Sequence, residues 1–263
     1  MRWIFGDVHG LLAPLRTLVD EINRVDPAAK LYFVGDYVNR GPESRGVIDF
    51  LIKLRNARFA RGNHDDIFDL VLNGLQYAES SPKGDRVAAL KWFLQHGLIQ
   101  TFVSYGADFG MLERMQRDAS EKQLKQLVDL VPPEHRRFIR NLRAIVEEDD
   151  LFIAHAMWPL DQPDSDPKIS FRLNDPALRY KLLWGRYDYD ALASEKAWKR
   201  TGYFGHTPVQ NYVDNGATNQ PLTGNRIALL DTGAVMATDG RLTAYNADTK
   251  QYLQAAPGGK LVS

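Results

Sequence analysis

The chain has 263 residues, of which 44% are apolar and 25% charged, and its 33 basic residues balance its 33 acidic ones. This composition fits a globular protein with one large domain or two small ones, and it gives no reason to expect a nucleic-acid or membrane partner. There is no cysteine, so any metal must be held by nitrogen and oxygen ligands. No apolar run approaches the ~20 residues that cross a bilayer, and no signal-peptide pattern opens the chain, so we expect a soluble cytoplasmic protein.

Three short apolar runs predict buried strands at residues 3–5, 31–34 and 58–60, each followed closely by a glycine. Between them, apolar residues recur at helical spacing over residues 11–22 and again over residues 47–54. Strands that alternate with helices in this way are typical of a parallel sheet covered by helices.

The rest of the chain divides into a helical part and a strand-rich part. Residues 67–146 have a helical pattern without a strong strand signal, and we expect a helical insertion there. The strands resume at residues 151–154. Four later strand-like runs, at residues 202–205, 226–231, 242–246 and 251–254, predict a second, mixed sheet.

Polar loops follow the predicted strands, and each has a glycine or alanine beside groups that can bind a metal. Residues 6–10 (GDVHG), 35–41 (GDYVNRG) and 61–65 (RGNHD) follow the first three strands, and His155 and His206 follow two later ones. Because ligands bind at the carboxyl ends of strands in parallel sheets, we expect these groups to converge at one edge of the sheet. Taken alone, a glycine-aspartate pair after a strand is more often only a turn than a metal site. A single histidine there is more often a hydrogen-bonded structural residue than a metal ligand. Together, their nitrogen and oxygen ligands suit manganese, iron or zinc better than calcium.

Four of these blocks, at residues 6–10, 35–41, 62–65 and 205–208 (GHTP), resemble the calcineurin-like metallophosphoesterases. More narrowly, they resemble the phosphoprotein phosphatase branch in its bacterial and phage form, and the resemblance runs from residue 4 to about residue 246. It implies an α/β fold of two packed mixed β-sheets flanked by helices, a four-layer α/β/β/α sandwich, which agrees with the strand pattern. We therefore expect one domain over residues 1–254, with the insertion at 67–146 and a flexible tail at 255–263.

The resemblance also implies two bound divalent metal ions, with manganese as the expected metal and iron or zinc as alternatives. Asp7 and His9 would hold the first ion, and Asp36 would bridge both. Three further ligands would complete the second site, namely Asn63, His155 and His206. Two cations close together lower the pKa of a shared water, so that hydroxide attacks phosphorus without a serine or cysteine nucleophile.

Three more residues receive roles in catalysis from the same resemblance. Arg40 would bind the substrate phosphate, since a guanidinium group matches phosphate oxygens with a planar fork. Arg186 would be a second clamp. His64 would be the general acid that protonates the leaving oxygen, and a histidine near its ordinary pKa can do so at neutral pH.

Asn39 departs from the pattern of phosphoprotein phosphatases, which have an aspartate there as the partner of the general-acid histidine. An amide can still accept a hydrogen bond from His64 but brings no charge, so the tuning of the acid and the substrate class are both affected. Dinucleoside-tetraphosphate hydrolases of the same superfamily also lack this aspartate. Tyr37 and residues 41–48, in contrast, resemble the bacterial protein phosphatases.

We therefore expect metal-dependent phosphomonoester hydrolysis, with phosphoserine or phosphothreonine proteins as substrates. The alternative is a hydrolase of dinucleoside tetraphosphates, so that the partner is a phosphorylated protein or a small phosphoester. A second alternative is a non-catalytic phosphate-binding module, against which His64 and Arg40 argue, because binding alone needs no general acid. The pattern leaves the oligomeric state open.

Overall fold

The computed structural model describes residues 1–74, 85–163, 175–212, 219–236 and 239–262. The strands are β1 (Arg2–Phe5), β2 (Lys30–Phe33), β3 (Ala57–Phe59), β4 (Ile145–Glu147), β5 (Leu151–Ala154), β6 (Thr201–Phe204), β7 (Leu222–Gly224), β8 (Ile227–Leu229), β9 (Leu242–Asn246), β10 (Tyr252–Ala255) and β11 (Leu261–Val262). The helices are α1 (Leu12–Val25), α2 (Ser44–Leu51), α3 (Asn63–Asn73), α4 (Arg86–Phe93), α5 (Ile99–Ser104), α6 (Phe109–Met115), α7 (Glu121–Leu130), α8 (Pro133–Arg140) and α10 (Pro176–Trp184), with short helical turns at η2 (Leu94–Leu98), η3 (Tyr189–Leu192) and η4 (Val209–Tyr212).

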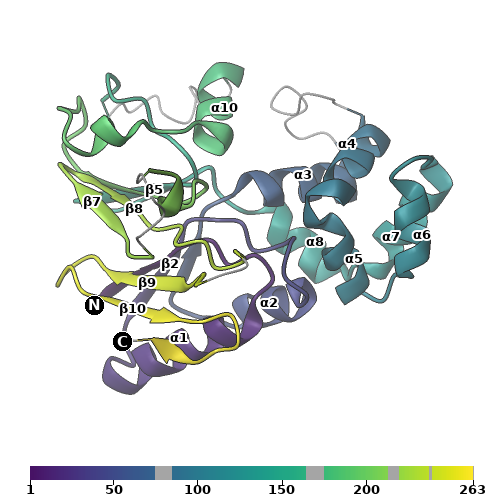
Figure 1. Ribbon diagram of the computed structural model, residues 1–263, viewed down its shortest axis with the longest axis horizontal. Helices are drawn as coiled ribbons and strands as arrows, with labels where there is room; N and C mark the ends of the chain where they lie inside the picture. Colours follow the sequence, from purple (N-terminus) through teal and green to yellow (C-terminus); the bar gives the residue numbers. More distant parts are fainter. Residues whose placement is uncertain (75–84, 164–174, 213–218, 237–238, 263) are drawn as a thin grey trace.

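The strands form two mixed sheets that pack against each other. The six-stranded sheet has the order β11-β10-β9-β1-β2-β3, and the five-stranded sheet has the order β4-β5-β6-β8-β7. Helices α1 and α2 cover the outer face of the first sheet, α10 covers the second, and the helices α3 to α8 stand to one side (Figure 1). This arrangement confirms the expected fold of two packed mixed sheets flanked by helices. Within the described residues, no helix is long and apolar enough to span a membrane.

The apolar strands are buried on both faces, which explains their unbroken runs of apolar residues. In β1, Trp3 and Phe5 face the core beneath α1 and α2, and Ile4 faces the core between the two sheets. In β5, Phe152 faces the core beneath α10, and Ile153 faces the core between the sheets. Successive residues of each strand therefore point into different apolar layers. The three layers lie beneath α1 and α2, between the two sheets, and beneath α10.

The C-terminal strands do not join the sheet that their position in the sequence predicts. Strand β9 pairs antiparallel with β1, where Phe5 lies opposite Ala244, and β10 pairs with β9, so both belong to the first sheet. The expected flexible tail is also wrong up to residue 262, because β11 pairs with β10 and Thr17 Oγ1 donates a hydrogen bond to the Gly259 carbonyl, 2.8 Å away. These contacts place the end of the chain in the first sheet.

The helical insertion begins earlier than its pattern predicts and ends before residue 146. Helix α3 begins at Asn63, directly after β3, and α8 ends at Arg140. Strand β4 begins at Ile145 and pairs with β5. Residues 75–84, which the helical pattern also covers, lie outside the described residues.

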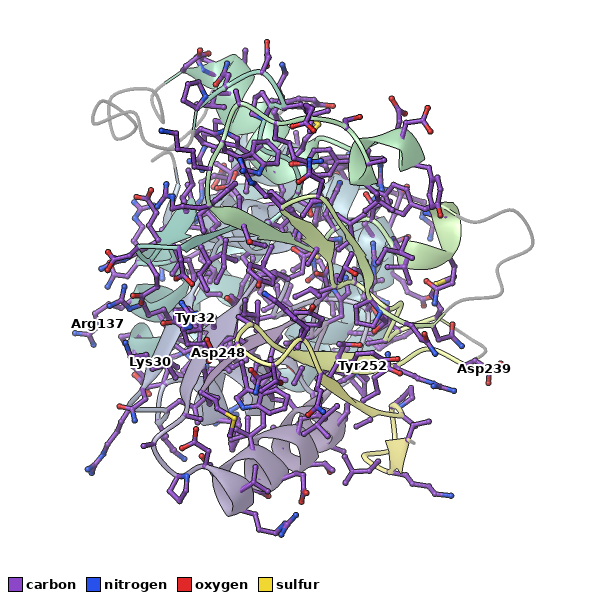
Figure 2. The ribbon with its side chains drawn as sticks, turned by 90° about the vertical axis from the view of Figure 1, so that its left-hand side faces the viewer. Lys30, Tyr32, Arg137, Asp239, Asp248 and Tyr252 are labelled. Atoms are coloured by element: carbon purple, nitrogen blue, oxygen red, sulfur yellow. The ribbon has the colours of Figure 1, made fainter. Side chains whose placement is uncertain are left out.

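Polar contacts join the two sheets at the N-terminal end of β1, which is the end away from Asp7. The Arg2 guanidinium contacts the carboxylates of Asp150 and Asp248, which lie beside β5 and β9. Tyr32 donates a hydrogen bond to Glu148 Oε1, 2.7 Å away. Asp248 and Tyr32 are labelled in Figure 2. The sheets are thus tied by polar contacts at this end, which leaves the opposite ends of β1 and β2 for the functional loops.

Arg61, which follows β3, anchors the insertion to the sheet. Its side chain is 1% exposed and forms ion pairs with Asp66, 3.1 Å away, and Asp69, 2.9 Å away. It also donates hydrogen bonds to the carbonyls of Ile139 and Arg140 in α8. One buried cation thus holds α3 and α8 against the end of β3, beside the functional loop at residues 62–65.

We expect Arg61→Met to destabilise the protein by about 3 kcal/mol, since removing one partner of a buried ion pair costs ~3–5 kcal/mol. The lower end applies because Asp66 keeps a contact with Arg179 and Asp69 keeps one with Arg140. The measurement is urea unfolding, with Arg58→Met as the control. Arg58 is 51% exposed in its ion pair with Glu148, so its loss should cost no more than about 1 kcal/mol. Equal losses in the two variants would contradict this role of Arg61.

Candidate metal centre

The six residues expected to bind metal come together at the carboxyl ends of strands from both sheets. From the first sheet, the centre receives residues that follow β1, β2 and β3, namely Asp7, His9, Asp36 and Asn63. From the second sheet, it receives residues that follow β5 and β6, namely His155 and His206. The convergence of the loops is as expected, but they come from two sheets rather than from one edge of one sheet.

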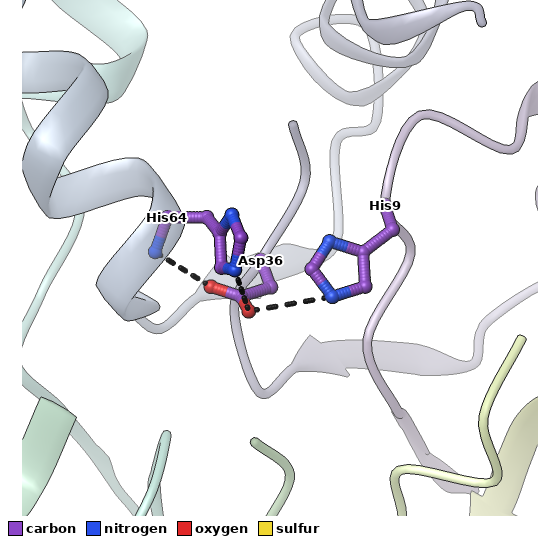
Figure 3. Close-up of side chains that lie close together, drawn as sticks. All are labelled: His9, Asp36 and His64. Atoms are coloured by element: carbon purple, nitrogen blue, oxygen red, sulfur yellow. Dashed lines mark hydrogen bonds and ion pairs between the residues drawn. The ribbon is translucent and has the colours of Figure 1, made fainter. Parts of the chain in front are cut away.

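Asp36 lies at the middle of this cluster, and its two carboxylate oxygens face different histidines. Oδ2 lies 3.5 Å from His9 Nε2 and 4.0 Å from His64 Nε2 (Figure 3). Oδ1 lies 3.5 Å from His155 Nε2 and accepts a hydrogen bond from the His64 backbone N–H. A carboxylate placed between two groups of ligands is the geometry that a bridge between two metal ions requires.

The second half of the cluster centres on Asn63. Its Oδ1 lies 2.9 Å from His155 Nε2 and 3.0 Å from His206 Nδ1. The His206 backbone N–H in turn donates to the Asp7 carboxylate, 3.1 Å from Oδ2. These contacts place Asn63, His155 and His206 in one group that adjoins Asp7. Ligand atoms of Asp7, Asp36 and His155 all lie within 4.8 Å of one another.

Backbone carbonyls fix which ring nitrogen carries the proton in two of the histidines. His9 Nδ1 lies 3.1 Å from the Val38 carbonyl, and His155 Nδ1 lies 3.1 Å from the Val34 carbonyl. Because a carbonyl oxygen can only accept, each Nδ1 carries the hydrogen and each Nε2 presents a lone pair to the centre. Such a contact is the usual way in which a protein orients a metal-binding imidazole.

The burial of these groups gives the centre an electrostatic imbalance that a cation would remove. Burial first, and then the carboxylates of Asp231 and Asp36, raise the pKa of Asp7 well above its ordinary value. Burial lowers the pKa of His155 to about 3 and also lowers the pKa of His206. The imidazoles are therefore neutral, as metal ligands must be, while the repulsion that Asp7 receives from the neighbouring carboxylates exceeds the favourable effect of Arg40.

The residues present fit the binding of metal ions. His155 Nε2, which carries no hydrogen because Nδ1 donates to the Val34 carbonyl, lies 2.9 Å from Asn63 Oδ1, so two acceptors face each other. The donors are carboxylate oxygen, amide oxygen and imidazole nitrogen, a set that suits manganese, iron or zinc. The facing acceptors, the neutral imidazoles and the crowded carboxylates all point to cations in this centre.

Several of the loop residues have left-handed backbone conformations that non-glycine residues rarely adopt. Asparagine, aspartate and histidine tolerate this region better than other residues, and four of the five here are of these types. Their φ angles are between 45° and 72°, in His9, Asp36, Asn39, Arg40 and His206. Strained backbone of this kind is concentrated at functional sites, where it turns side chains toward a common point.

Two glycines allow the loops to approach the carboxylates closely. A Cβ atom at Gly62 would lie 2.0 Å from Asp36 Oδ1, and one at Gly205 would lie 2.0 Å from Asp7 Oδ1. Neither position can accept a side chain without moving a carboxylate of the centre. The glycines of the sequence motifs are thus explained by packing against Asp7 and Asp36.

Both arginines expected to bind phosphate lie at the edge of the centre. Arg40 is exposed, and its guanidinium lies 3.0 Å from His9 Nε2 and 3.3 Å from His64 Nε2. Arg186 is exposed and donates to Thr207 Oγ1, 2.8 Å away, next to His206. After burial and the His155 ring, the charge of Arg186 also lowers the pKa of His206. The two guanidinium groups therefore add positive charge to the open side of the cluster.

The insertion holds the loop that contains Asn39 and Arg40. The Arg40 backbone N–H donates to the Gly97 carbonyl, and Gly97 packs so closely that a Cβ there would lie 2.5 Å from Arg40 N. Thr101 Oγ1, in α5, donates to Asn39 Oδ1 and accepts from the Asn39 backbone N–H, both at 2.8 Å. The Asn39 amide nitrogen then faces His64 Nδ1, 2.8 Å away. The expected contact between Asn39 and His64 is therefore present, but Asn39 donates the hydrogen bond instead of accepting it, because its oxygen already accepts from Thr101.

The surroundings of His64 favour its neutral form. Burial first, and then the neighbouring His9 and Arg40 side chains, lower the pKa of His64 well below its ordinary value. Asn39 adds no negative charge to oppose this shift. The amide nitrogen of Asn39 donates to Nδ1 of the neutral ring, so the ring proton lies on Nε2, the nitrogen that faces Asp36 and Arg40. His64 thus presents a hydrogen-bond donor rather than a charged acid.

Three residues outside the expected set of ligands and catalytic residues also shape the centre. Asp231 is buried after β8, and its charge adds to the effect of burial in raising the pKa of Asp7. Asp65 accepts hydrogen bonds from the backbone N–H groups of Asp36, Tyr37 and Gly62, so it holds two functional loops together. Thr101 orients Asn39. The Asp-Thr-Gly sequence at 231–233 resembles the other glycine-containing loops and was the one available signal, whereas Thr101 has none.

Comparison with known proteins assigns the chain to a family. A family profile described as calcineurin-like phosphoesterase matches residues 2–210. The chain therefore belongs to the calcineurin-like phosphoesterases, and it is a hydrolase of the metallophosphoesterase type. The family depends on two metal ions, and the cluster around Asp36 provides groups that can hold them.

Individual relatives agree with this assignment. A symmetrical bis(5'-nucleosyl)-tetraphosphatase of Marinomonas sp. (strain MWYL1) is 36% identical over 102 residues, which is 36% of this chain and 37% of that protein. One from Thioalkalivibrio sulfidiphilus is 48% identical over 62 residues, 23% of each chain. The matches thus cover well under half of these relatives. The crystal structure of a metallophosphoesterase from Sphaerobacter thermophilus superimposes with a TM-score of 0.53 at 16% identity, covering 100% of this chain and 87% of that one, which supports the fold.

Proposed function

We propose that this protein hydrolyses dinucleoside tetraphosphates symmetrically, with water, to two nucleoside diphosphates, and that manganese is its metal. The observation that carries the proposal is the uncharged pair of His64 and Asn39 at the centre. The names of the two relatives described above support it. Hydrolysis of dinucleoside tetraphosphates therefore becomes the main hypothesis. Hydrolysis of phosphoproteins, the main expectation from the sequence, becomes the alternative.

The chemistry of the leaving group connects this pair to the substrate. Cleavage of the central P–O–P linkage releases a nucleoside diphosphate whose terminal phosphate has a second pKa of about 6, so it leaves at neutral pH with little protonation. Cleavage of phosphoserine releases an alkoxide, a far stronger base that needs a proton as the bond breaks. A neutral His64, which can donate a hydrogen bond from Nε2, is sufficient for the first reaction and poorly suited to the second.

The other residues have roles that do not depend on the identity of the leaving group. The six ligands would hold two cations, which supply Lewis-acid charge and activate the attacking water. Arg40 and Arg186 would bind the oxygens of the phosphate chain from the open side of the centre. A tetraphosphate offers more anionic oxygens to these two guanidinium groups than a single phosphate does.

Tyr37 and residues 41–48 resemble bacterial protein phosphatases in sequence. In the structure, these residues contribute to packing. Tyr37 is fully buried, donates to the Ala60 carbonyl, 2.7 Å away, and packs against Phe59. In the segment 41–48, Gly41 donates to the His9 carbonyl, and Val47 and Ile48 pack in the core. Neither feature faces a substrate, so neither separates the two substrate classes.

The test is a parallel measurement of kcat/KM for diadenosine tetraphosphate and a phosphoserine peptide, with Mn²⁺ added and the products identified. We expect a clear preference for diadenosine tetraphosphate, with ADP as the sole nucleotide product. A preference for the phosphopeptide would contradict the proposal and restore the protein-phosphatase alternative. The absence of turnover on both, with retained phosphate binding, would favour a non-catalytic module.

Asn39→Asp tests the link between this residue and the substrate. A carboxylate beside His64 favours the imidazolium form, so it raises the pKa of His64 and keeps the acid protonated to a higher pH. We expect the alkaline limb of kcat/KM for the phosphopeptide to move to higher pH, and the ratio of phosphopeptide to dinucleotide activity to rise. The measurement is kcat/KM against pH for both substrates. Alkaline limbs that superimpose with those of the wild type would show that Asn39 does not tune the acid.

A further inference from the structure

A continuous strip of aromatic rings, Trp92, Phe93 and Trp184, connects the insertion to the metal centre. The Phe93 ring lies 5.1 Å from the ring of His64, and the Trp92 ring lies 4.9 Å from that of Phe93. From the other side, Trp184 in α10 lies 6.2 Å from the ring of His206 and stacks on Trp92 at 5.8 Å and 27°. Trp92 is thus two ring contacts away from both halves of the centre.

A cavity of about 270 Å³ lies on Trp92. It is lined by residues of α4 and η2 and by one residue that follows α6, namely Ala88, Lys91, Trp92, Gln95 and Gln116. Trp92 is half-buried, so part of its indole is available to a ligand. Within the described residues, the side chains of Lys91, Gln95 and Gln116 engage in no hydrogen bond or ion pair.

We propose that this cavity is the binding site for one nucleobase of the substrate, stacked on Trp92. The indole offers an apolar face for any base, since stacking on aromatic side chains depends little on sequence. The amides of Gln95 and Gln116 each offer a donor and an acceptor, the pair that matches the N6 and N7 edge of adenine. The Lys91 ammonium group would attract the phosphates nearest to the ribose.

The position of the cavity agrees with the length of the substrate. The aromatic strip separates the cavity from His64 by the rings of Phe93 and Trp92, a gap that the ribose and the first phosphate would span. The central linkage then falls at the metal centre, between Arg40 and Arg186. This inference rests on the proposed function, and it assigns to the insertion the recognition of the nucleoside.

The test is calorimetric binding of ADP and of inorganic pyrophosphate to the manganese-loaded full chain. Pyrophosphate shares the phosphates of ADP but lacks the base. Loss of one base-stacking indole costs about 1–3 kcal/mol, so Trp92→Ala should raise the ratio of the Kd of ADP to that of pyrophosphate by about 5- to 150-fold. Gln116→Ala removes one neutral hydrogen bond and should raise the same ratio about fivefold. Phe109→Ala is the matched control, because Phe109 is a 53% exposed aromatic residue of the insertion that does not line the cavity.

An equal loss of affinity for both ligands in Trp92→Ala would assign Trp92 to the fold and overturn the proposal. An unchanged ratio in Trp92→Ala and Gln116→Ala would overturn it as well, and if wild type still hydrolysed diadenosine tetraphosphate, the proposed function would stand without this site. If the ratio rises as expected but the dinucleotide is not hydrolysed, the base site stands and the proposed reaction fails. Preferential loss of phosphopeptide affinity in Trp92→Ala would assign the cavity to an aromatic peptide side chain and contradict the proposal.

Discussion

Replacing Asp36 with asparagine is expected to abolish hydrolysis of every phosphate substrate and to remove at least one of the two metal ions. Asp36 is the residue whose two oxygens face His9 on one side and His155 on the other, at 3.5 Å in both cases. An amide keeps the size of the side chain but removes its charge, and its nitrogen cannot coordinate a cation. The measurements are metal content by mass spectrometry and kcat/KM with Mn²⁺ added.

The control for this variant is Asp20→Asn on the exposed face of α1, which should leave metal content and rates unchanged. Burial raises the pKa of Asp36 well above its ordinary value, so the apo protein should tolerate the Asp36→Asn substitution without unfolding. Among the described residues, the Asp36 side chain accepts a hydrogen bond from the His64 N–H, which the amide oxygen can still accept. Two bound ions and normal turnover in Asp36→Asn would refute its role as the bridge.

His64→Asn should lower kcat by an amount that depends on the leaving group. Loss of a general acid costs ~10²–10⁴-fold where the leaving group needs a proton, and we expect a loss in this range for a phosphoserine peptide. For p-nitrophenyl phosphate and diadenosine tetraphosphate, whose leaving groups are weak bases, the loss should be smaller. The resemblance assigns His64 to proton donation rather than to metal binding, so metal content should stay close to that of the wild type, although ligand atoms of His9, Asp36 and His64 lie within 4.8 Å of one another.

His96→Asn serves as the control for His64→Asn, because His96 is an exposed histidine of the same insertion and lies outside the centre. Its rates should match those of the wild type on all three substrates. A uniform loss across good and poor leaving groups in His64→Asn would remove His64 from any role in proton donation. Loss of one metal ion in His64→Asn would instead identify His64 as a metal ligand. Its proximity to His9 and Asp36 is compatible with that role.

The positions of the metal ligands could be predicted because local signals mark them. Each follows a short apolar strand, and Gly62 and Gly205 are glycines for a physical reason, the close approach of Asp36 and Asp7. A strand followed by glycine and a carboxylate or histidine can be identified from a few neighbouring residues. All six expected ligands therefore lie in one cluster.

Long-range pairing could not be predicted in the same way. The residue types of β9 and β10 indicate that they are strands, but nothing local determines that β9 pairs with β1 rather than with β8. The same limit applies to Thr101, which contacts Asn39 across 62 positions of sequence. The size of the downward pKa shift of His64 could not be predicted for a related reason, because it depends on burial and on Arg40, which only the folded chain brings together.

The most direct test of this account is the hydrolysis of diadenosine tetraphosphate before chelation, after thorough removal of metal, and after Mn²⁺ is returned. Because the proposed ligands Asp7, Asp36 and Asn63 with three histidines would hold two cations, and because the chain has no cysteine to act as a nucleophile, we expect catalysis to depend on the metals. We predict that activity disappears with the metal and returns as about two equivalents of Mn²⁺ bind, with ADP as the product. Full activity in the thoroughly chelated protein would contradict the account.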